Sequence, residues 1–172
     1  AFLAGTLAIS GLPLLSGFFS KDAILTGAYA NGHFLAWSLG LAGAVITAFY
    51  MFRLLFLAFF GEERLTAEAR RHLHESPPVM TVPLIILAIF SVIAGYVGLP
   101  AAVGEKADLF GRFLEPVARA GHAPPPTAVE WNLILVSTTA AAAGLFIAWL
   151  FYVRYPSTPS RLAALFPGIY RV

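Results

Sequence analysis

The sequence predicts an all-α integral membrane protein with four spanning segments, the first a discontinuous (broken) helix, followed by the start of an amphipathic segment at the C-terminus. Hydrophobic residues make up 59% of the 172 residues and charged residues only 12%, with a mean hydropathy of +0.79. Soluble domains usually contain about 25% charged residues. The apolar residues also gather in runs of the length that crosses a bilayer as a helix, which is about 20 residues.

Composition also excludes several kinds of function. The net charge is only +2, so no broad basic surface for nucleic acid is indicated. The chain contains no cysteine, which rules out disulfides, thiol catalysis and cysteine-ligated metals. It opens on AFLAGTLAIS, which reads like the inside of a helix, so we expect a fragment of a longer polypeptide.

The first expected span, residues 1–30, is interrupted. Three residues that helices tolerate poorly lie inside it: Gly11, Pro13 and Gly17. Proline removes a backbone donor and clashes with the preceding turn. We therefore expect one half-helix up to about residue 10, a short irregular link, and a second half over about residues 18–29. Asn31-Gly32 is a turn signal that closes it.

Three further spans are expected at 34–60, 79–99 and 131–153. The third of the four has Pro83 in its first turn, and the last opens on Trp131, a residue typical of membrane interfaces. Residues 1–155 therefore read as one transmembrane helical segment. Two amphipathic stretches are expected outside the spans, ADLFGRFLEPVARA at 107–120 and the inner-surface or lateral segment that starts at 156–172.

Basic residues predict the orientation. The 61–78 connection and the C-terminal tail lie on one side, because two spans separate them. That side carries six arginines, and the loop on the other side carries three basic residues: Lys106, Arg112 and Arg119. The positive-inside rule then places the 61–78 connection and the C-terminus in the cytoplasm.

The string SKD sets two charges inside this apolar sequence. Residues 1–20 carry no charge, and after Lys21 and Asp22 the next charged residue is Arg53. Eight uncharged residues separate Asp22 from the Asn31-Gly32 turn. At about 1.5 Å per helical residue, this spacing places Lys21 well inside the bilayer. A buried ionisable residue usually faces a bundle interior or a hydrated cavity, and transporters often place ion sites at helix breaks.

We therefore assign Lys21 as a proton carrier, because removal from water disfavours the charged form of a lysine. Asp22 is assigned as a second relay station or a counter-charge. Consecutive residues are about 100° apart on a helix, so the two side chains are expected to meet different partners. The plain alternative is a structural anchor, in which Lys21 extends along the helix to the membrane surface.

Other polar residues carry weaker signals. Arg53 cannot release a proton. It either extends to the inner surface or tunes a neighbouring lysine or carboxylate electrostatically. His33 is expected in contact with water at the start of the second span. His72 and His74 could suggest a metal, but the ligand set is thin, so we expect a surface loop, with no metal and no cofactor on this chain.

Several strings resemble one family. LAISGLPLLSGFFSKDAIL, TAFYMFRLLFLAFFGEER, HESPPVMTVPLIILAIFSVIAGYVG and RLAALFPGIYR together resemble the antiporter-like membrane subunits of respiratory complex I, and the related Mrp-type cation/proton antiporters. The resemblance covers essentially the whole chain and is greatest to the C-terminal part of the largest, distal subunit. It implies that Lys21 matches the lysine on a broken helix near the exit of a proton half-channel. Asp22 then matches the acidic residue that follows it, and Arg53 an arginine of the next helix.

The resemblance also implies partners and a location. The chain would be a subunit of a proton-pumping NADH:quinone oxidoreductase in the bacterial inner membrane, with no redox chemistry of its own. NADH, FMN, the iron–sulfur clusters and quinone would bind to partner subunits. Other membrane-arm subunits, especially a neighbouring antiporter-like subunit, and the lipid bilayer would surround it. The first inverted repeat, the central lysine and the long lateral helix would lie outside this chain. An Mrp-type sodium/proton antiporter subunit is the alternative.

Overall fold

The computed structural model describes residues 1–61, 74–98 and 127–156, and the single positions 66, 70, 109, 113, 158 and 159. Its regular elements are helical. In chain order they are α1 (Phe2–Ile9), α2 (Ser16–Ala30), α3 (Phe34–Phe59), α5 (Pro78–Ile93), the 3₁₀ turn η1 (Ala94–Val97), α7 (Thr127–Trp149) and the π-helical end η2 (Leu150–Arg154).

Three of these helical segments are long and apolar enough to cross a membrane. They cover Phe34–Phe59, Pro78–Val97 and Ala128–Arg154. The expectation of a helical membrane chain is confirmed at this level. Helices α1 and α2 have 8 and 15 residues, so neither alone reaches the roughly 20 residues that a span requires.

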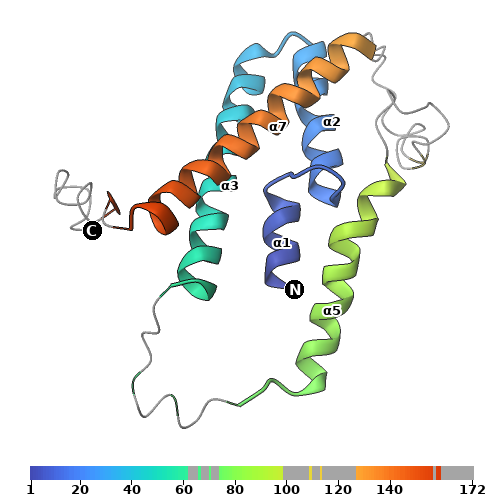
Figure 1. The fold of residues 1–172 in the computed structure, drawn as a ribbon. Coiled ribbons are helices and arrows are strands. Elements are labelled where there is room, and N and C mark those ends of the chain that lie inside the picture. Colours follow the sequence, from blue (N-terminus) through green and yellow to red (C-terminus); the bar gives the residue numbers. More distant parts are fainter. Residues whose placement is uncertain are drawn as a thin grey trace.

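Helices α3 and α7 form the most extensive helix contact, and α7 crosses in front of α3 in Figure 1. The buried residues described in α7 each lie three or four positions from another of the set and so share one face: Glu130, Leu133, Ile134, Ser137, Ala141, Gly144 and Ala148. At Gly144 a Cβ atom would overlap the backbone oxygen of Val45. Glycine therefore lets the two backbones approach closely, as small residues do between membrane helices.

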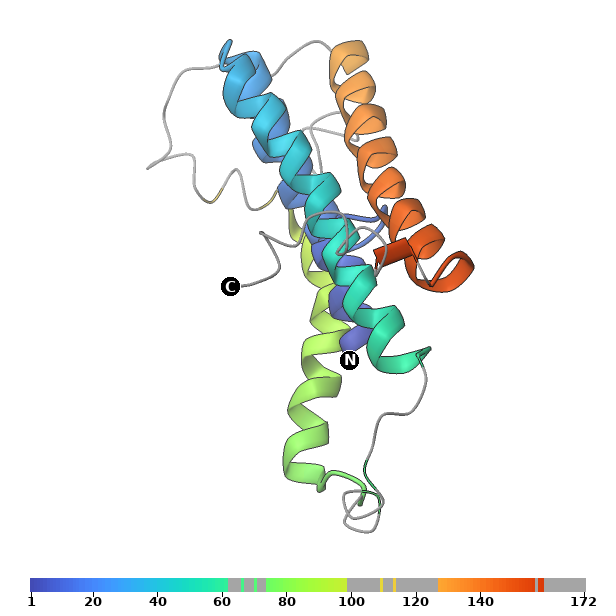
Figure 2. The ribbon, with the colours of Figure 1, turned by 90° about the vertical axis from the view of Figure 1, so that its left-hand side faces the viewer.

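Helix α1 lies between α5 and the α3–α7 pair (Figures 1 and 2). Phe52, Leu55 and Ala148 form a buried apolar cluster, against which Leu7 of α1 packs. No residue of α5 is buried, and its large apolar side chains are exposed. An apolar surface of this kind suits contact with lipid or with other membrane helices.

The largest differences from the expected helices concern the start of α7 and the place of Pro83. Helix α7 begins at Thr127, before the expected start at 131, so Glu130 belongs to its first turn. A carboxylate is favourable there, next to the positive end of the helix dipole. Pro83 lies inside α5 beyond its first turn, because the helix already begins at Pro78.

Two expectations fall mainly outside the described residues. The amphipathic stretch 107–120 is described only at Leu109 and Phe113, and the segment 156–172 only at Pro156, Thr158 and Pro159.

Candidate proton-relay site

A short link, residues 10–15, joins α1 to α2. Its backbone takes a left-handed conformation at two positions. Helix α1 ends at Ile9 and α2 begins at Ser16. Two link residues have left-handed backbone angles, Gly11 with φ +68° and Leu14 with φ +70°. Glycine adopts this conformation without steric cost, whereas leucine does not. Pro13 also lies in the link, which therefore contains the first two of the three residues expected to interrupt the helix.

Gly17 has a different role from the expected one. It lies in the first turn of α2 and not in the link. The backbone oxygen of Ala8 occupies the place that a Cβ atom of residue 17 would take. Gly17 therefore permits a close approach of α2 to the end of α1.

The turn η1 also contacts the link and the start of α2. The hydroxyl of Tyr96 donates a hydrogen bond to the backbone oxygen of Leu14 at 3.1 Å. The ring of Tyr96 packs on Phe19, with the centroids 5.4 Å apart. At Gly95, a Cβ atom would come within 2.6 Å of the Cα atom of Ser16. The turn η1 thereby presses against the start of α2 and stabilises the strained Leu14.

Lys21 extends back from α2 to this link. Its Nζ atom donates a hydrogen bond to the backbone oxygen of Gly11 at 3.2 Å. The lysine side chain lies so close to Gly11 that a Cβ atom there would come within 2.6 Å of Nζ. The ammonium therefore sits at the C-terminal end of α1, where the helix dipole is negative and favours a cation.

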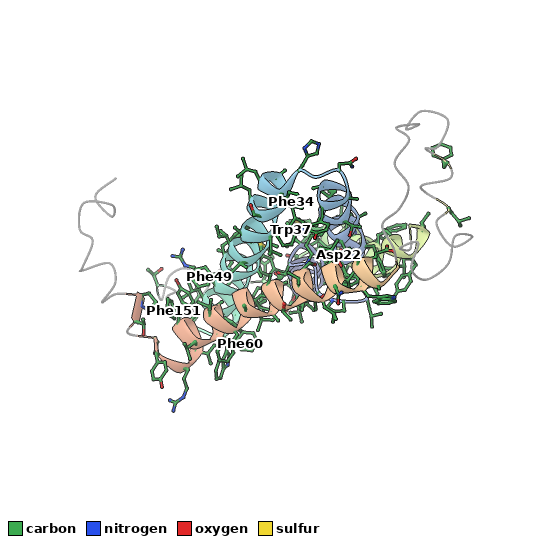
Figure 3. The ribbon with its side chains drawn as sticks, turned by 90° about the horizontal axis from the view of Figure 1, so that it is seen from above. Asp22, Phe34, Trp37, Phe49, Phe60 and Phe151 are labelled. Atoms are coloured by element: carbon green, nitrogen blue, oxygen red, sulfur yellow. The ribbon has the colours of Figure 1, made fainter. Side chains whose placement is uncertain are left out.

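Asp22 points to a different helix. It is 3% exposed, and its Oδ1 atom accepts a hydrogen bond from the hydroxyl of Ser137 on α7. Figure 3 shows Asp22 where α7 crosses α2. Within the described part of the chain, neither the Oδ2 atom of Asp22 nor the hydroxyl oxygen of the fully buried Thr6 has a hydrogen-bond partner.

The lysine and the aspartate thus have separate hydrogen-bond partners, Gly11 on one side and Ser137 on the other. Their charges still act on one another, because they are consecutive residues. Two half-buried or buried charges beside a link between two helices form an arrangement that can store a proton on either group.

Arg53 lies on α3 and is exposed. Its guanidinium is 5.6 Å from the ring centroid of Tyr152, a cation–π contact to the end of α7. The structure therefore brings Lys21 to the link, Asp22 to Ser137 of α7, and Arg53 to an aromatic ring of η2. His33 is exposed at the start of α3, and its expected contact with water at the membrane surface stays a prediction.

Sequence reasoning missed two residues of α7. Ser137 binds Asp22, and Glu130 is a buried carboxylate, 8% exposed, two turns earlier on the same face. The polar and small residues along 130–148 recur at helical spacing, and this pattern could have indicated that they share one buried face of α7. Over residues 1–61, 74–98 and 127–156, no group of three His, Cys, Asp or Glu side chains lies close enough to hold a metal ion.

Two known protein families match this chain, and together the matches cover nearly all of it. Residues 1–47 match the family described as "NADH:quinone oxidoreductase/Mrp antiporter, TM". Residues 53–165 match a second family, described as the transmembrane C-terminus of an NADH dehydrogenase subunit of complex I. The first match contains the link, Lys21 and Asp22, and the second begins at Arg53.

Three curated relatives show the same kinship. NADH-quinone oxidoreductase subunit L of Neisseria meningitidis serogroup B is 34% identical over 98% of this chain and 29% of its own length. NAD(P)H-quinone oxidoreductase chain 5 of a Picosynechococcus species is 39% identical over 99% of this chain and 28% of its own length. NADH-quinone oxidoreductase subunit L of Mycobacterium tuberculosis is 40% identical over 92% of this chain and 25% of its own length. The chain thus spans less than a third of the length of these relatives.

Proposed function

This chain belongs to the family of antiporter-like membrane subunits of NADH:quinone oxidoreductase (complex I), and we propose that it forms part of a proton-translocating subunit of that complex, of the subunit L or chain 5 type. Protons would move through a relay of Lys21 and Asp22, coupled to quinone reduction on other subunits. The observation that carries the proposal is the position of Lys21. Its ammonium binds the backbone oxygen of Gly11 just beyond the end of α1, next to a buried carboxylate.

We propose further that α1, the link and α2 together make one interrupted span, the fourth in this chain. Free backbone groups at membrane depth are tolerated only inside protein or beside a hydrated cavity. Two contacts support this reading of the link: Tyr96 of η1 donates to the backbone oxygen of Leu14, and Lys21 donates to that of Gly11. A hydrated break is a place where a lysine can exchange protons with water.

In this scheme Lys21 gives up a proton and becomes a neutral amine, and takes one back to become an ammonium. Asp22 is the adjacent station or the counter-charge, so that a proton arriving at one group changes the energy of the other. Arg53 is proposed as a weaker electrostatic influence from outside the pair, at its contact with Tyr152.

Partners and location follow as parts of the same proposal. NADH, FMN, the iron–sulfur clusters and quinone would bind to other subunits. A neighbouring antiporter-like subunit would cover part of the apolar surface, and lipid the rest. The membrane would be the inner membrane of a bacterium. By the positive-inside rule, the 61–78 connection and the C-terminus would lie on its cytoplasmic side.

A second candidate is a subunit of an Mrp-type sodium/proton antiporter, because the family that matches residues 1–47 includes both kinds of protein. The names of the relatives favour complex I. Proton movement driven by a sodium gradient, without NADH or quinone, would instead support the antiporter.

The test uses the complete subunit in inverted membrane vesicles, with proton uptake measured per NADH oxidised. Lys21→Ala should reduce proton transfer through this site by roughly 10²-fold, the lower end of what a positioned proton-transfer group contributes. The amount of assembled complex should stay normal. Ser20→Ala, at the exposed neighbouring position, is the control and should pump normally.

Lys21→Arg separates the relay from a plain charge requirement. Arginine keeps the positive charge but cannot release a proton, so this variant should be as impaired as Lys21→Ala. Normal pumping by Lys21→Ala would refute the proposed function, and normal pumping by Lys21→Arg would refute the role of proton carrier.

A further inference from the structure

We propose that Ser137 is a positioning residue for proton transfer at Asp22. Its hydroxyl binds Oδ1 and leaves Oδ2 as the oxygen that takes and releases the proton. This inference rests on the proposed function and extends it to a residue 115 positions away in the chain.

The geometry of the carboxylate carries the inference. Ser137 and Asp22 are only 2% and 3% exposed, so the hydrogen bond between them lies inside the protein. Hydrogen bonds to ionised groups are stronger than those between neutral groups. Oδ1 is occupied by this bond, whereas Oδ2 has no partner among the described residues. The two oxygens of one carboxylate are therefore not equivalent.

The bond can persist through a transfer cycle. When a proton adds to Oδ2, the carboxylate becomes a neutral carboxylic acid, and Oδ1 still accepts from Ser137. When the proton leaves the same oxygen, the negative charge returns and the serine proton stays in place. The carboxyl group therefore keeps one orientation, and the reacting oxygen keeps its place relative to Lys21.

Neighbouring hydroxyls of α7 behave differently. Thr138 and Thr139 follow Ser137 directly, but their hydroxyls donate to backbone oxygens of their own helix, at 2.8 and 2.9 Å. Of these three consecutive hydroxyls, that of Ser137 is the one that leaves its helix and bonds to α2. Its place is fixed by the close contact of α7 with α3, through Gly144 about two turns later. Ser137 is therefore held on a rigid element, which is what a positioning role requires.

The experiment compares three variants at this position in the complete subunit, in membrane vesicles. Ser137→Ala removes the hydroxyl and should lower proton transfer per NADH oxidised about tenfold, the loss expected for a hydrogen bond to a charged group. Ser137→Thr restores a hydroxyl and should recover pumping, whereas Ser137→Cys, a weaker donor, should be intermediate. Thr138→Val is the matched control, because the Thr138 hydroxyl bonds within its own helix.

A second measurement separates positioning from packing. The pH profile of pumping should change in Ser137→Ala and return to the original profile in Ser137→Thr. If Ser137→Ala fails to accumulate, the comparison of Ser137→Cys with Ser137→Thr decides, and equal pumping by these two would overturn the inference.

Asp22→Asn keeps the two proposals distinguishable. A loss of pumping in Asp22→Asn with normal pumping in Ser137→Ala would overturn the role of Ser137 and leave the relay in place. Normal pumping in both variants would overturn the roles of Asp22 and Ser137, whereas the role of Lys21 is decided separately by Lys21→Ala. Loss of pumping in Ser137→Ala without recovery in Ser137→Thr would also count against positioning by the hydroxyl.

Discussion

The ammonium nitrogen of Lys21 on α2 lies 3.2 Å from the backbone oxygen of Gly11, two residues beyond the end of α1. Both residues are needed for this contact. Gly11 supplies a left-handed backbone and an open side, and Lys21 supplies a donor long enough to reach back across the link. The position of the charge thus depends on the backbone of the link, and not only on the sequence of α2.

Gly11→Ala should move Lys21 without removing it. The added Cβ would approach Nζ, Cε and Cδ of Lys21 at 2.6, 2.8 and 2.9 Å, so the side chain must shift. The left-handed backbone adds roughly 1–2 kcal/mol of strain for any residue other than glycine. We expect a loss of proton pumping per NADH oxidised, with Lys21 still present.

Gly32→Ala is the matched control for that variant. Gly32 has nearly the same φ, +73°, but a Cβ atom there meets nothing within 4 Å. It should therefore carry the same backbone strain and pump normally. Equal pumping by the two alanine variants would show that the contact with Lys21 is unimportant.

Gly144→Ala should weaken the contact between α3 and α7. Its Cβ would overlap the backbone oxygen of Val45 and approach the Cβ of Ala48 at 2.9 Å. Overpacking of this kind costs about 1–3 kcal/mol, which exceeds the gain of about 1 kcal/mol in helix propensity. The apparent unfolding temperature of the purified complete subunit in detergent should fall.

Gly43→Ala tests the same exchange on α3 where a Cβ atom meets nothing within 4 Å. Helix propensity alone then acts, and the unfolding temperature should stay the same or rise. A rise in both variants would contradict the close packing of α3 against α7 at Gly144.

Variants of Arg53 test whether its charge influences proton transfer by Lys21 and Asp22. If its charge tunes the relay, Arg53→Lys should pump normally and Arg53→Gln should pump less, because charges in an apolar layer act over longer distances than in water. Tyr152→Leu is the control, since it removes the aromatic ring 5.6 Å away but keeps the arginine. Equal losses in Arg53→Gln and Tyr152→Leu would indicate that the contact serves packing instead.

Much of the site could be predicted from the residues of α1 and α2. A break near Gly11 and Pro13, and two charges shortly after it, follow from local chemistry, because glycine and proline act on the backbone within a turn or two. The expectation that Lys21 and Asp22 meet different partners also follows from helix geometry, and their hydrogen bonds agree with it. The same local reasoning places Gly17 in the break. It lies instead in α2, where the neighbouring Ala8 oxygen is what requires a glycine.

Residues far along the chain could not be assigned in this way. Ser137 reads as one hydroxyl in the run Ser137-Thr138-Thr139, and nothing in that run says which of the three leaves its helix. The sequence pattern leaves Glu130 in a loop, because the start of α7 carries no strong signal after three prolines. Only the crossing of α7 over α2 selects Ser137 as the partner of Asp22.

By itself the sequence determined that this is a helical membrane chain, where its apolar spans lie, and that Lys21 and Asp22 follow a stretch rich in helix-breaking residues. These properties depend on composition and on the spacing of residues within one segment. The tertiary structure decided that Lys21 binds Gly11, that Ser137 binds Asp22 and that Gly17 and Gly144 allow close backbone approach. The physical reason is that each of these contacts joins groups whose distance is set by the packing of separate helices, which no local pattern specifies.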